Sequence, residues 1–269
     1  MLNRKLVSLL RLFSCYAIGF SLCSQSIAAQ LLNFEGRATE IDSGGLLYTE
    51  KHQIIIKDTG EYISSYVEYL DPEGQVFAMK TLDYAKSFLA PDLMFYDKRT
   101  KERITVFFNA GASYLSVLFE NGAKREETMI KLGESIVVVD AGFDRLIEHN
   151  WSALRKNKKI GFTFLALTRA QLINFEAIEL ESSNTSVDLE LHPRNFFINM
   201  LVDPIALNYD VKTKRLTSFE GLTNIERFEN GKRTEDNYLA RIDYSYEPLK
   251  AYTVLPSEKV LPEESARSK

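Results

Sequence analysis

Residues 61–84 read EYISSYVEYLDPEGQVFAMKTLDY, and this stretch decides the fold class. Two runs with many aromatic and aliphatic residues, Glu61–Leu70 and Gln75–Tyr84, flank the tetrapeptide Asp71-Pro72-Glu73-Gly74. Proline at the second position and glycine at the fourth position suit a type I turn. A connection this short joins antiparallel neighbours, so the stretch predicts a β-hairpin.

Both faces of this hairpin are partly apolar. In Glu61–Leu70, one face contains Ile63, Val67 and Tyr69, and the other contains Tyr62, Tyr66 and Leu70. A sheet with one solvated face alternates cleanly between apolar and polar side chains, and this one does not. The sheet is therefore expected to be covered on both sides or to curve around an apolar interior.

Strands separated by turn residues are expected along most of the chain. They are Leu31–Ile41, Leu46–Lys57, Leu93–Asp97, Arg103–Asn109, Ser113–Glu120, Ile160–Thr168, Gln171–Glu181, Val187–Leu191, Ile205–Tyr209, Leu216–Ile225 and Tyr238–Tyr246. Asn121-Gly122 is a strong hairpin signal. Short connections in the first half favour an antiparallel meander.

One segment has the periodicity of a helix, from Ala141 to about Asn157. Its apolar residues recur at helical spacing and form one stripe: Phe143, Leu146, Ile147, Trp151 and Leu154. Asp140 is a reasonable N-cap. We therefore predict a mainly β (α+β) fold: a large curved antiparallel sheet or half-barrel, with one amphipathic helix at about 141–157 packed on it.

The first 29 residues have the three parts of a secretory signal peptide. Arg4 and Lys5 give a charged start, and Leu12–Cys23 is an apolar stretch followed by small residues. That stretch is too short to cross a bilayer, which takes about 20 apolar residues. No later stretch reaches that length, so no transmembrane segment is expected in the mature chain. We expect cleavage near Ala28 or Ala29.

Both cysteines of the chain, Cys15 and Cys23, lie in this predicted signal peptide. Lipidation of one of them is the alternative to plain cleavage. It is disfavoured because Leu22 is bulkier than the residue that usually precedes a lipidated cysteine. After plain cleavage the chain would contain no thiol, which excludes disulfides, thiolate nucleophiles and cysteine metal sites.

Cleavage would also leave an acidic chain. Arg4, Lys5 and Arg11 would be lost, so Lys+Arg would fall from 33 to 30 against 37 Asp+Glu, a net charge of −7. An acidic chain without a Lys/Arg-rich block is a poor candidate for nucleic-acid binding. Export without disulfides is typical of bacterial periplasmic proteins, so we expect a periplasmic location.

The mature chain is expected to form a single β-rich domain over residues 30–255, followed by a flexible tail over 256–269. The tail contains two prolines among many charges and lacks periodic apolar residues. The apolar stretch Phe196–Val202 is expected to be a short helix or a lid.

A short internal similarity links two segments. Phe34-Glu35-Gly36 recurs as Phe219-Glu220-Gly221, and Thr49-Glu50 recurs as Thr234-Glu235. Two related hairpins at the two ends of the sheet would explain it, and so would chance combined with shared hairpin chemistry. Both interpretations stay open.

No set of residues makes a positive case for catalysis. His52, His149 and His192 are scattered and match no zinc motif. Asp144, Glu148 and His149 would offer an oxygen-rich metal site, but adjacent helical residues diverge by about 100°, which favours a solvated helix face. Nucleotide-binding and nucleophile-elbow motifs are absent from the sequence. We expect no catalytic residue, no metal and no cofactor.

Aromatic side chains on strands are the remaining signal. Core packing accounts for most of them, but together with the two-faced strands they suggest an apolar cavity inside a curved sheet. The residues expected to line it are Tyr66, Phe77, Phe107, Tyr114, Phe119 and Trp151.

Two parts of the chain resemble an uncharacterised family of Gram-negative envelope proteins. One is residues 66–92, with Asp-Pro-Glu-Gly-Gln-Val-Phe-Ala at 71–78. The other begins with Val-Asp-Ala-Gly-Phe-Asp at 139–144 and Asn150-Trp151, and continues through 201–205 and 219–225. The family implies no activity. The pattern of strands is also similar to the half-barrels of periplasmic lipoprotein carriers, an analogy of fold alone.

These features predict a non-catalytic periplasmic protein that binds a lipid, another apolar ligand or an envelope partner. The alternative is a hydrolase that acts on envelope glycan or lipid with Asp and Glu residues, which requires acidic side chains to converge in a cleft. A third interpretation is a scaffold that adds a sheet edge to a partner.

Overall fold

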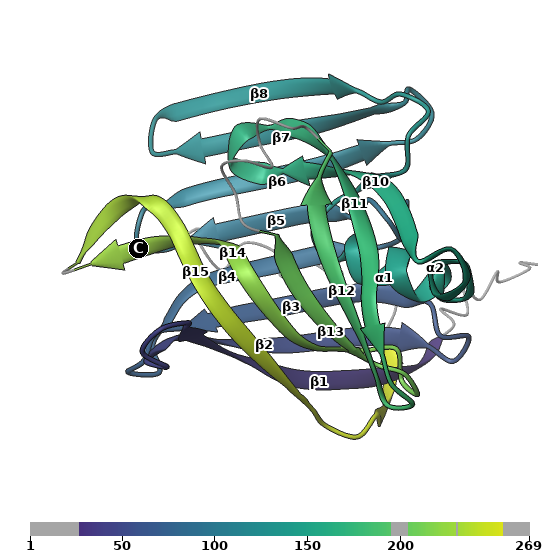
Figure 1. Cartoon of the computed structure of the whole chain (residues 1–269). Coiled ribbons are helices and arrows are strands. Elements are labelled where there is room, and N and C mark those ends of the chain that lie inside the picture. The colour runs from purple at the N-terminus through teal and green to yellow at the C-terminus, as the bar shows by residue number, and fades with distance from the viewer. Residues whose placement is uncertain (1–26, 195–203, 230, 255–269) are drawn as a thin grey trace, which may run out of the picture.

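The computed structural model describes residues 27–194, 204–229 and 231–254 (Figure 1). Most of the predicted signal peptide, the predicted helix or lid at Phe196–Val202 and the predicted tail from residue 256 therefore lie outside the described residues. The described part of the chain forms one curved sheet with two short helices.

The first eight strands lie side by side in the order in which they occur in the sequence, each antiparallel to the next. They are β1 (Ile27–Glu40), β2 (Leu46–Lys57), β3 (Tyr62–Leu70), β4 (Val76–Asp83), β5 (Asp92–Asp97), β6 (Glu102–Asn109), β7 (Tyr114–Asn121) and β8 (Lys124–Lys131). The turns between them are short, which is why the meander forms.

The second half of the chain extends the same sheet from the other side of β1. Its elements are β9 (Val137–Val138), α1 (Gly142–His149), α2 (Trp151–Asn157), β10 (Lys159–Ala166), the 3-10 turn η1 (Leu167–Arg169), β11 (Gln171–Ser182), β12 (Ser186–Pro193), β13 (Ile205–Asp210), β14 (Leu216–Glu229), β15 (Lys232–Tyr246) and β16 (Lys250–Val254). The sheet order is β8 to β1, then β15 down to β9, and β16 pairs with the start of β1. The predicted curved, mainly β fold is confirmed, with one difference: β9 pairs with β10 in parallel.

The predicted helical segment at about 141–157 is confirmed, but it is divided into two helices that meet at Asn150. The Asn150 side chain donates a hydrogen bond to the Leu146 carbonyl at 2.9 Å and ends α1. The helix N-cap is Ala141, not Asp140. Asp140 has a positive φ of 46° and forms an ion pair instead.

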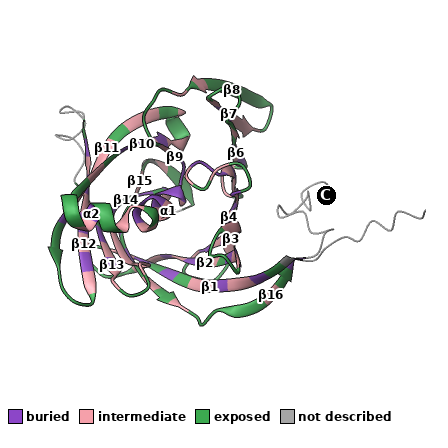
Figure 2. Ribbon diagram, turned by 90° about the vertical axis from the view of Figure 1, so that its right-hand side faces the viewer, coloured by how far each residue is buried: buried purple, intermediate pink, exposed green. Residues whose placement is uncertain are grey.

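The predicted apolar stripe is nevertheless buried across both helices. It forms the helix-side cluster, whose buried members are Val138, Phe143, Leu146, Ile147, Leu154, Phe162, Ala177, Val187, Leu189, Leu191, Leu207 and Tyr209. Trp151 packs against it while partly exposed. The helices lie at one end of the curved sheet (Figures 1 and 2), so this cluster covers that end.

The two halves of the sheet meet through side chains. The edge cluster contains Leu82, Tyr84, Ala90, Leu93, Ile104, Val106, Leu115 and Val117 from the region of β4–β7, together with Val139 and Leu165 from the region of β9 and β10. The strands β8 and β9 end the sheet order without pairing with each other. The sheet thus curls around its own interior without a continuous ladder of hydrogen bonds (Figure 2).

The internal sequence similarity does not correspond to a structural repeat. The hairpins β1–β2 and β14–β15 are neighbours in the middle of the sheet order, not at its two ends. In the first hairpin Gly36 pairs with Glu50, whereas Gly221 pairs with Ala240 in the second. Because the two registers differ, the structure favours the interpretation that the similarity arose by chance combined with shared hairpin chemistry.

The contact between the β4–β5 loop and α1 depends on a glycine. A Cβ atom built on Gly142 would lie 2.0 Å from the backbone oxygen of Leu89. The Leu89 oxygen also accepts a hydrogen bond from the Val139 amide at 2.9 Å. Gly142 therefore lets the start of α1 lie directly against the loop.

We expect Gly142→Ala to destabilise the fold by about 1–3 kcal/mol or more, the range for steric overpacking, although alanine is the better helix former by about 1 kcal/mol. Urea unfolding followed by circular dichroism measures the change. Gly133→Ala is the matched control, because a Cβ there meets nothing within 4 Å. Equal stability of the two variants would contradict the proposed close contact.

Candidate functional site

The distal half of the β14–β15 hairpin bends away from the regular sheet, and we call its described residues, 222–229 and 231–238, the strap. Its strand pairing shifts register twice, between Leu222 and Glu226 and between Glu226 and Phe228. Gly221, just before it, has a φ of +153°, which other residues rarely adopt. The strap lies at the end of the curved sheet opposite the helices (Figure 1).

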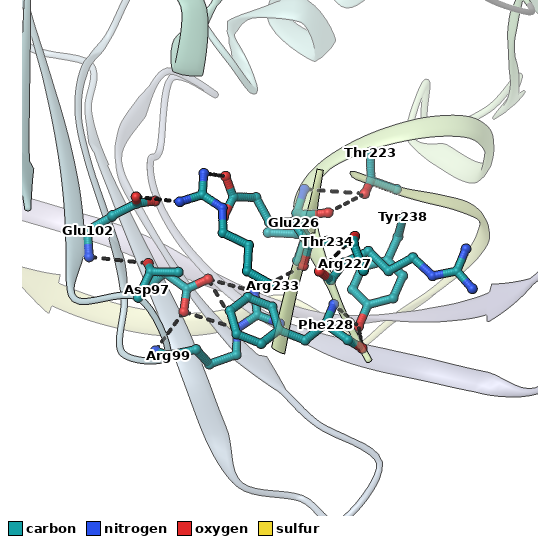
Figure 3. Close-up of polar contacts among 12 residues, drawn as sticks. Asp97, Arg99, Glu102, Thr223, Glu226, Arg227, Phe228, Arg233, Thr234 and Tyr238 are labelled. Carbon is teal, nitrogen blue, oxygen red and sulfur yellow. Dashed lines mark hydrogen bonds and ion pairs between the residues drawn. The ribbon is translucent and has the colours of Figure 1, made fainter. Parts of the chain in front are cut away.

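Arg99, in the turn after β5, attaches the strap to the first half of the sheet (Figure 3). It binds Asp97 in a bidentate pair, with Nε–Oδ1 at 3.0 Å and Nη2–Oδ2 at 2.6 Å. Its guanidinium lies between two rings, 4.0 Å from the centre of Phe77 and 4.1 Å from that of Phe228. Its Nη2 also donates to the Glu226 carbonyl at 3.2 Å.

Arg233, on the strap itself, provides a second attachment (Figure 3). It donates to the Glu102 carboxylate at 2.7 Å and to the Glu226 carboxylate. Glu102 lies on β6, and Asn121 at the end of β7 donates to it at 3.0 Å. Burial raises the pKa of Glu226, and the nearby Glu102 acts in the same direction, while Arg233 lowers it. We call the contacts of Arg99 and Arg233 the clasp.

Beneath the strap lies a buried face of the sheet that is rich in aromatic side chains; we call it the aromatic surface. The strap-side cluster contains Ala38, Tyr48, Val67, Tyr69, Phe77, Ala78, Ile225, Ala240 and Ile242. The ring of Tyr48 lies 5.7 Å from that of Tyr238 on the strap and 6.4 Å from that of Phe77. Burial raises the pKa of Tyr48 and Tyr69 well above the ordinary value, so both hydroxyls stay neutral.

A buried ion pair lies further inside, between β4 and the residues before α1. Lys80 Nζ is 2.7 Å from Asp140 Oδ1, and both side chains are largely buried. Burial alone would lower the pKa of Lys80, but the Asp140 carboxylate and Tyr69 together outweigh it and the pKa is raised. This pair joins β4 to the residues between β9 and α1.

Asp144, on the first turn of α1, is a second interior acid. It accepts a hydrogen bond from the Tyr209 hydroxyl at 2.8 Å. Burial raises its pKa, although the Tyr209 hydrogen bond and His52 act in the opposite direction. His52 itself pairs with Glu50 at 2.8 Å. Each of these interior groups thus has a hydrogen-bonding or ionic partner.

The three histidines do not converge. His52 pairs with Glu50, His192 pairs with Glu190, and His149 lies against the ring of Phe88 at 5.3 Å. Among the described residues no group of three metal-ligating side chains is close enough to hold a metal ion. Asp97, Glu102 and Glu226 do converge, as the hydrolase alternative requires, but each binds a guanidinium of the clasp.

The structure separates the six residues expected to line a cavity. Phe77 lies in the strap-side cluster, Phe119 packs against the edge cluster and Trp151 packs against the helix-side cluster. Tyr66, Phe107 and Tyr114 precede or follow buried residues of their strands and point to the outer face. Phe107 is 47% exposed, and burial and Glu68 raise the pKa of the Tyr66 hydroxyl to about 12.

Two hollows in the described surface lie on the outer face of the sheet. One, of about 420 Å³, is lined by Asp188, Glu190, Glu220, Arg241 and Asp243 among others. The second, of about 410 Å³, lies over β1 and β2 beside Glu35, Lys51 and Glu247. Both are polar and open, unlike the aromatic surface beneath the strap. Within the described ranges, no helix combines the length and apolar composition needed to cross a bilayer.

No protein-family model and no curated protein matches the chain. Among solved structures, it is similar to a β-barrel-like protein of a domain of unknown function (DUF1849) from Brucella abortus, with 8% identity and a TM-score of 0.43 over 85% of this chain and 100% of the other. A porin-like protein from Bacteroides uniformis matches with 10% identity and a TM-score of 0.23 over 80% and 97%. Both scores are too low to support an argument about function.

We expect Arg99→Lys to loosen the strap by about 1–3 kcal/mol, the range for losing a charge-assisted hydrogen bond, because lysine cannot reproduce the bidentate and stacked geometry. Amide hydrogen exchange over residues 222–238 measures it. Arg227→Lys is the matched control, since Arg227 is half-exposed and pairs only with the exposed Glu229 among the described contacts. Unchanged protection of the strap in Arg99→Lys would contradict the clasp.

The raised pKa of Asp144 gives a pH dependence of known sign. The folded state favours the protonated acid. The contribution of Asp144 to the free energy of unfolding therefore falls as the pH rises from its ordinary pKa of 3.8 to the raised pKa of the folded state. Asp144→Asn keeps an acceptor for Tyr209 and removes the charge. We expect the variant to be at least as stable as the wild type at pH 7, with a flatter pH profile by urea unfolding; the exposed Asp243→Asn is the control.

Proposed function

We propose that this chain is a non-catalytic binding protein of the bacterial envelope, and that it holds a lipid or another apolar ligand against the aromatic surface beneath the strap. One observation supports the proposal. The aromatic surface has a cover that is attached at its tip mainly by the polar clasp. A cover of this kind can move without unfolding the rest of the sheet.

The two ends of the curved sheet differ in how they are closed. The helix end has fully buried Leu146, Ile147 and Leu154, and exposing each such side chain costs about 1.5–3 kcal/mol. The strap contributes Ile225 as its buried apolar anchor, with Tyr238 and Phe228 partly buried. The β14–β15 ladder is internal to the hairpin, so it would survive if the strap swung away.

The chemistry of the surface suggests a class of ligand. Tyr48, Tyr69 and Tyr238 combine apolar rings with hydroxyl groups, and Phe77 adds a purely apolar ring. Such a mixture suits an acyl chain or a fused-ring molecule with few polar groups.

Export is the second part of the proposal. The predicted cleavage near Ala28 or Ala29 falls within β1, which begins at Ile27. Cleavage there would remove the pairings of Ile27 and Ala28 with β16 and keep those from Gln30 onward. We expect N-terminal sequencing of the protein recovered from the periplasmic fraction to begin at Ala29 or Gln30. Recovery of the uncleaved chain in the cytoplasm would contradict export.

Ligand binding can be tested on the protein purified from the envelope fraction without detergent. We expect native mass spectrometry to show a bound lipid, and a fluorescent fatty acid to exchange with it. The double variant R99A/R233A should exchange at least about tenfold faster, the loss of about 1.4 kcal/mol of strap attachment. Phe77→Leu should weaken binding, and Phe107→Leu, on the outer face, should not.

The outcome that overturns the proposal is equally specific. If wild type and R99A/R233A both carry no lipid and take up no fatty acid while circular dichroism shows them folded, the strap covers a core and not a ligand site. Equal loss of binding in Phe77→Leu and Phe107→Leu would also reject this location.

A further inference from the structure

Strand β8 is a regular, unpaired edge of the sheet. Its eight residues pair with β7 without any register shift, and seven of them are exposed. In the part of the chain that the structure describes, no strand pairs with its other side, and Figure 1 shows it as the outermost strand. It contains no proline and no glycine. An edge of this kind is a template for pairing with another strand.

A hydrogen bond at the end of the strand fixes which backbone groups point outward. The Leu132 amide donates to the Ser113 carbonyl at 2.9 Å, just beyond the end of β8. Since hydrogen-bonded pairs alternate along an antiparallel ladder, even-numbered residues of β8 bond to β7. The amides and carbonyls of Arg125, Glu127, Met129 and Lys131 therefore point away from the sheet.

The charges of β8 select one way in which two copies can pair. Two copies related by a two-fold axis pair symmetrically about one central residue. A register centred on Arg125, Glu126 or Glu127 places that charged residue opposite itself. A register centred on Thr128 places Arg125 opposite Lys131, again with like charges. A register centred on Ile130 avoids such a pair but overlaps only residues 129–131 of β8.

The register centred on Met129 has no such conflict. It places Met129 opposite Met129, Thr128 opposite Ile130, and Glu127 opposite Lys131 on both sides of the axis. The outward amides and carbonyls of residues 127, 129 and 131 then face one another. Met129, which is 56% exposed in the single chain, becomes covered. Opposite charges directly across a ladder stabilise it and like charges destabilise it.

We propose that β8 is a dimerisation edge whose partner is β8 of a second copy of this chain, antiparallel and centred on Met129. The pairing joins two curved sheets through their β8 edges. It does not involve the strap, so it is independent of the ligand proposed above. The charged residues of β8 disfavour the registers that place like charges opposite each other. The same residues favour the register centred on Met129, which places Glu127 opposite Lys131.

Sedimentation velocity over a dilution series tests the proposal on the chain without residues 1–26. We expect a concentration-dependent dimer. Lys131→Glu places two carboxylates opposite each other on both sides of the axis, because its partner is Glu127, and should weaken the dimer by about tenfold or more. The double variant E127K/K131E restores opposite charges and should recover most of that loss. Arg125→Glu is the control on the same strand, because Arg125 faces Gly133 in this register.

Met129→Pro tests the backbone contribution separately. Proline removes an outward amide that does not bond to β7, so an edge strand can accept it there. We expect loss of the dimer with little change in the thermal midpoint of unfolding. Thr128→Pro should instead destabilise the β7–β8 pair, because its amide points inward.

Each other result overturns the inference. A monomer at every concentration means that β8 is only a protected edge. A dimer that survives both Met129→Pro and Lys131→Glu is formed elsewhere on the molecule. A dimer that responds to Arg125→Glu but not to Lys131→Glu uses a different register. A complex with a different protein, or pairing of β8 with residues 255–269 of its own chain in cross-linking, assigns the edge another occupant.

Discussion

The structure depends on one constraint: a single long sheet has to bury its own concave face, because no second sheet covers it in the described part of the chain. Open sheets of more than about ten strands curl or split, and this one curls. Its two halves then bury each other through the edge cluster, where Leu82 and Leu93 meet Val139 and Leu165. Side chains make most of this contact, and no ladder of backbone hydrogen bonds joins β8 to β9, so the outer edge of β8 stays available.

Paired charges fix how the parts of this curled sheet fit together. Lys80 and Asp140 place the start of α1 against β4, and Arg99 with Asp97 places the strap against β5. Buried ion pairs are weak evidence for stability, because desolvation offsets most of the attraction. Their geometry is specific, however, and apolar clusters alone would allow the helices and the strap to slide. The positive φ of Asp140 is retained because its carboxylate has this partner.

The amino-acid pattern predicted the parts whose signals are local. Turn residues and apolar runs located β2, β3 and β4 closely, since each strand of that meander pairs with its sequence neighbour. The polar strand β8 and the middle of the strap, between the predicted strands Leu216–Ile225 and Tyr238–Tyr246, were not predicted as strands, because most of their residues are polar. The break at Asn150 was missed because the apolar stripe continues through it. The clasp had no local signal: Arg99 and Glu226 are 127 residues apart, and Arg233 and Glu102 are 131 apart.

The lining residues show where periodicity alone fails. Strands with two apolar faces do not reveal which face is concave, so Tyr66 and Phe107 could not be told apart from Phe77 by alternation. The curvature decides this, and it arises from contacts between halves that are distant in sequence. Once it is known, the two ends of the sheet differ in physical character. The helix end is closed by fully buried aliphatic side chains, whereas the strap end is closed by guanidinium groups, carboxylates and aromatic rings. Contacts of the second kind exchange more readily with water or with a ligand, which is why we place the proposed ligand site beneath the strap.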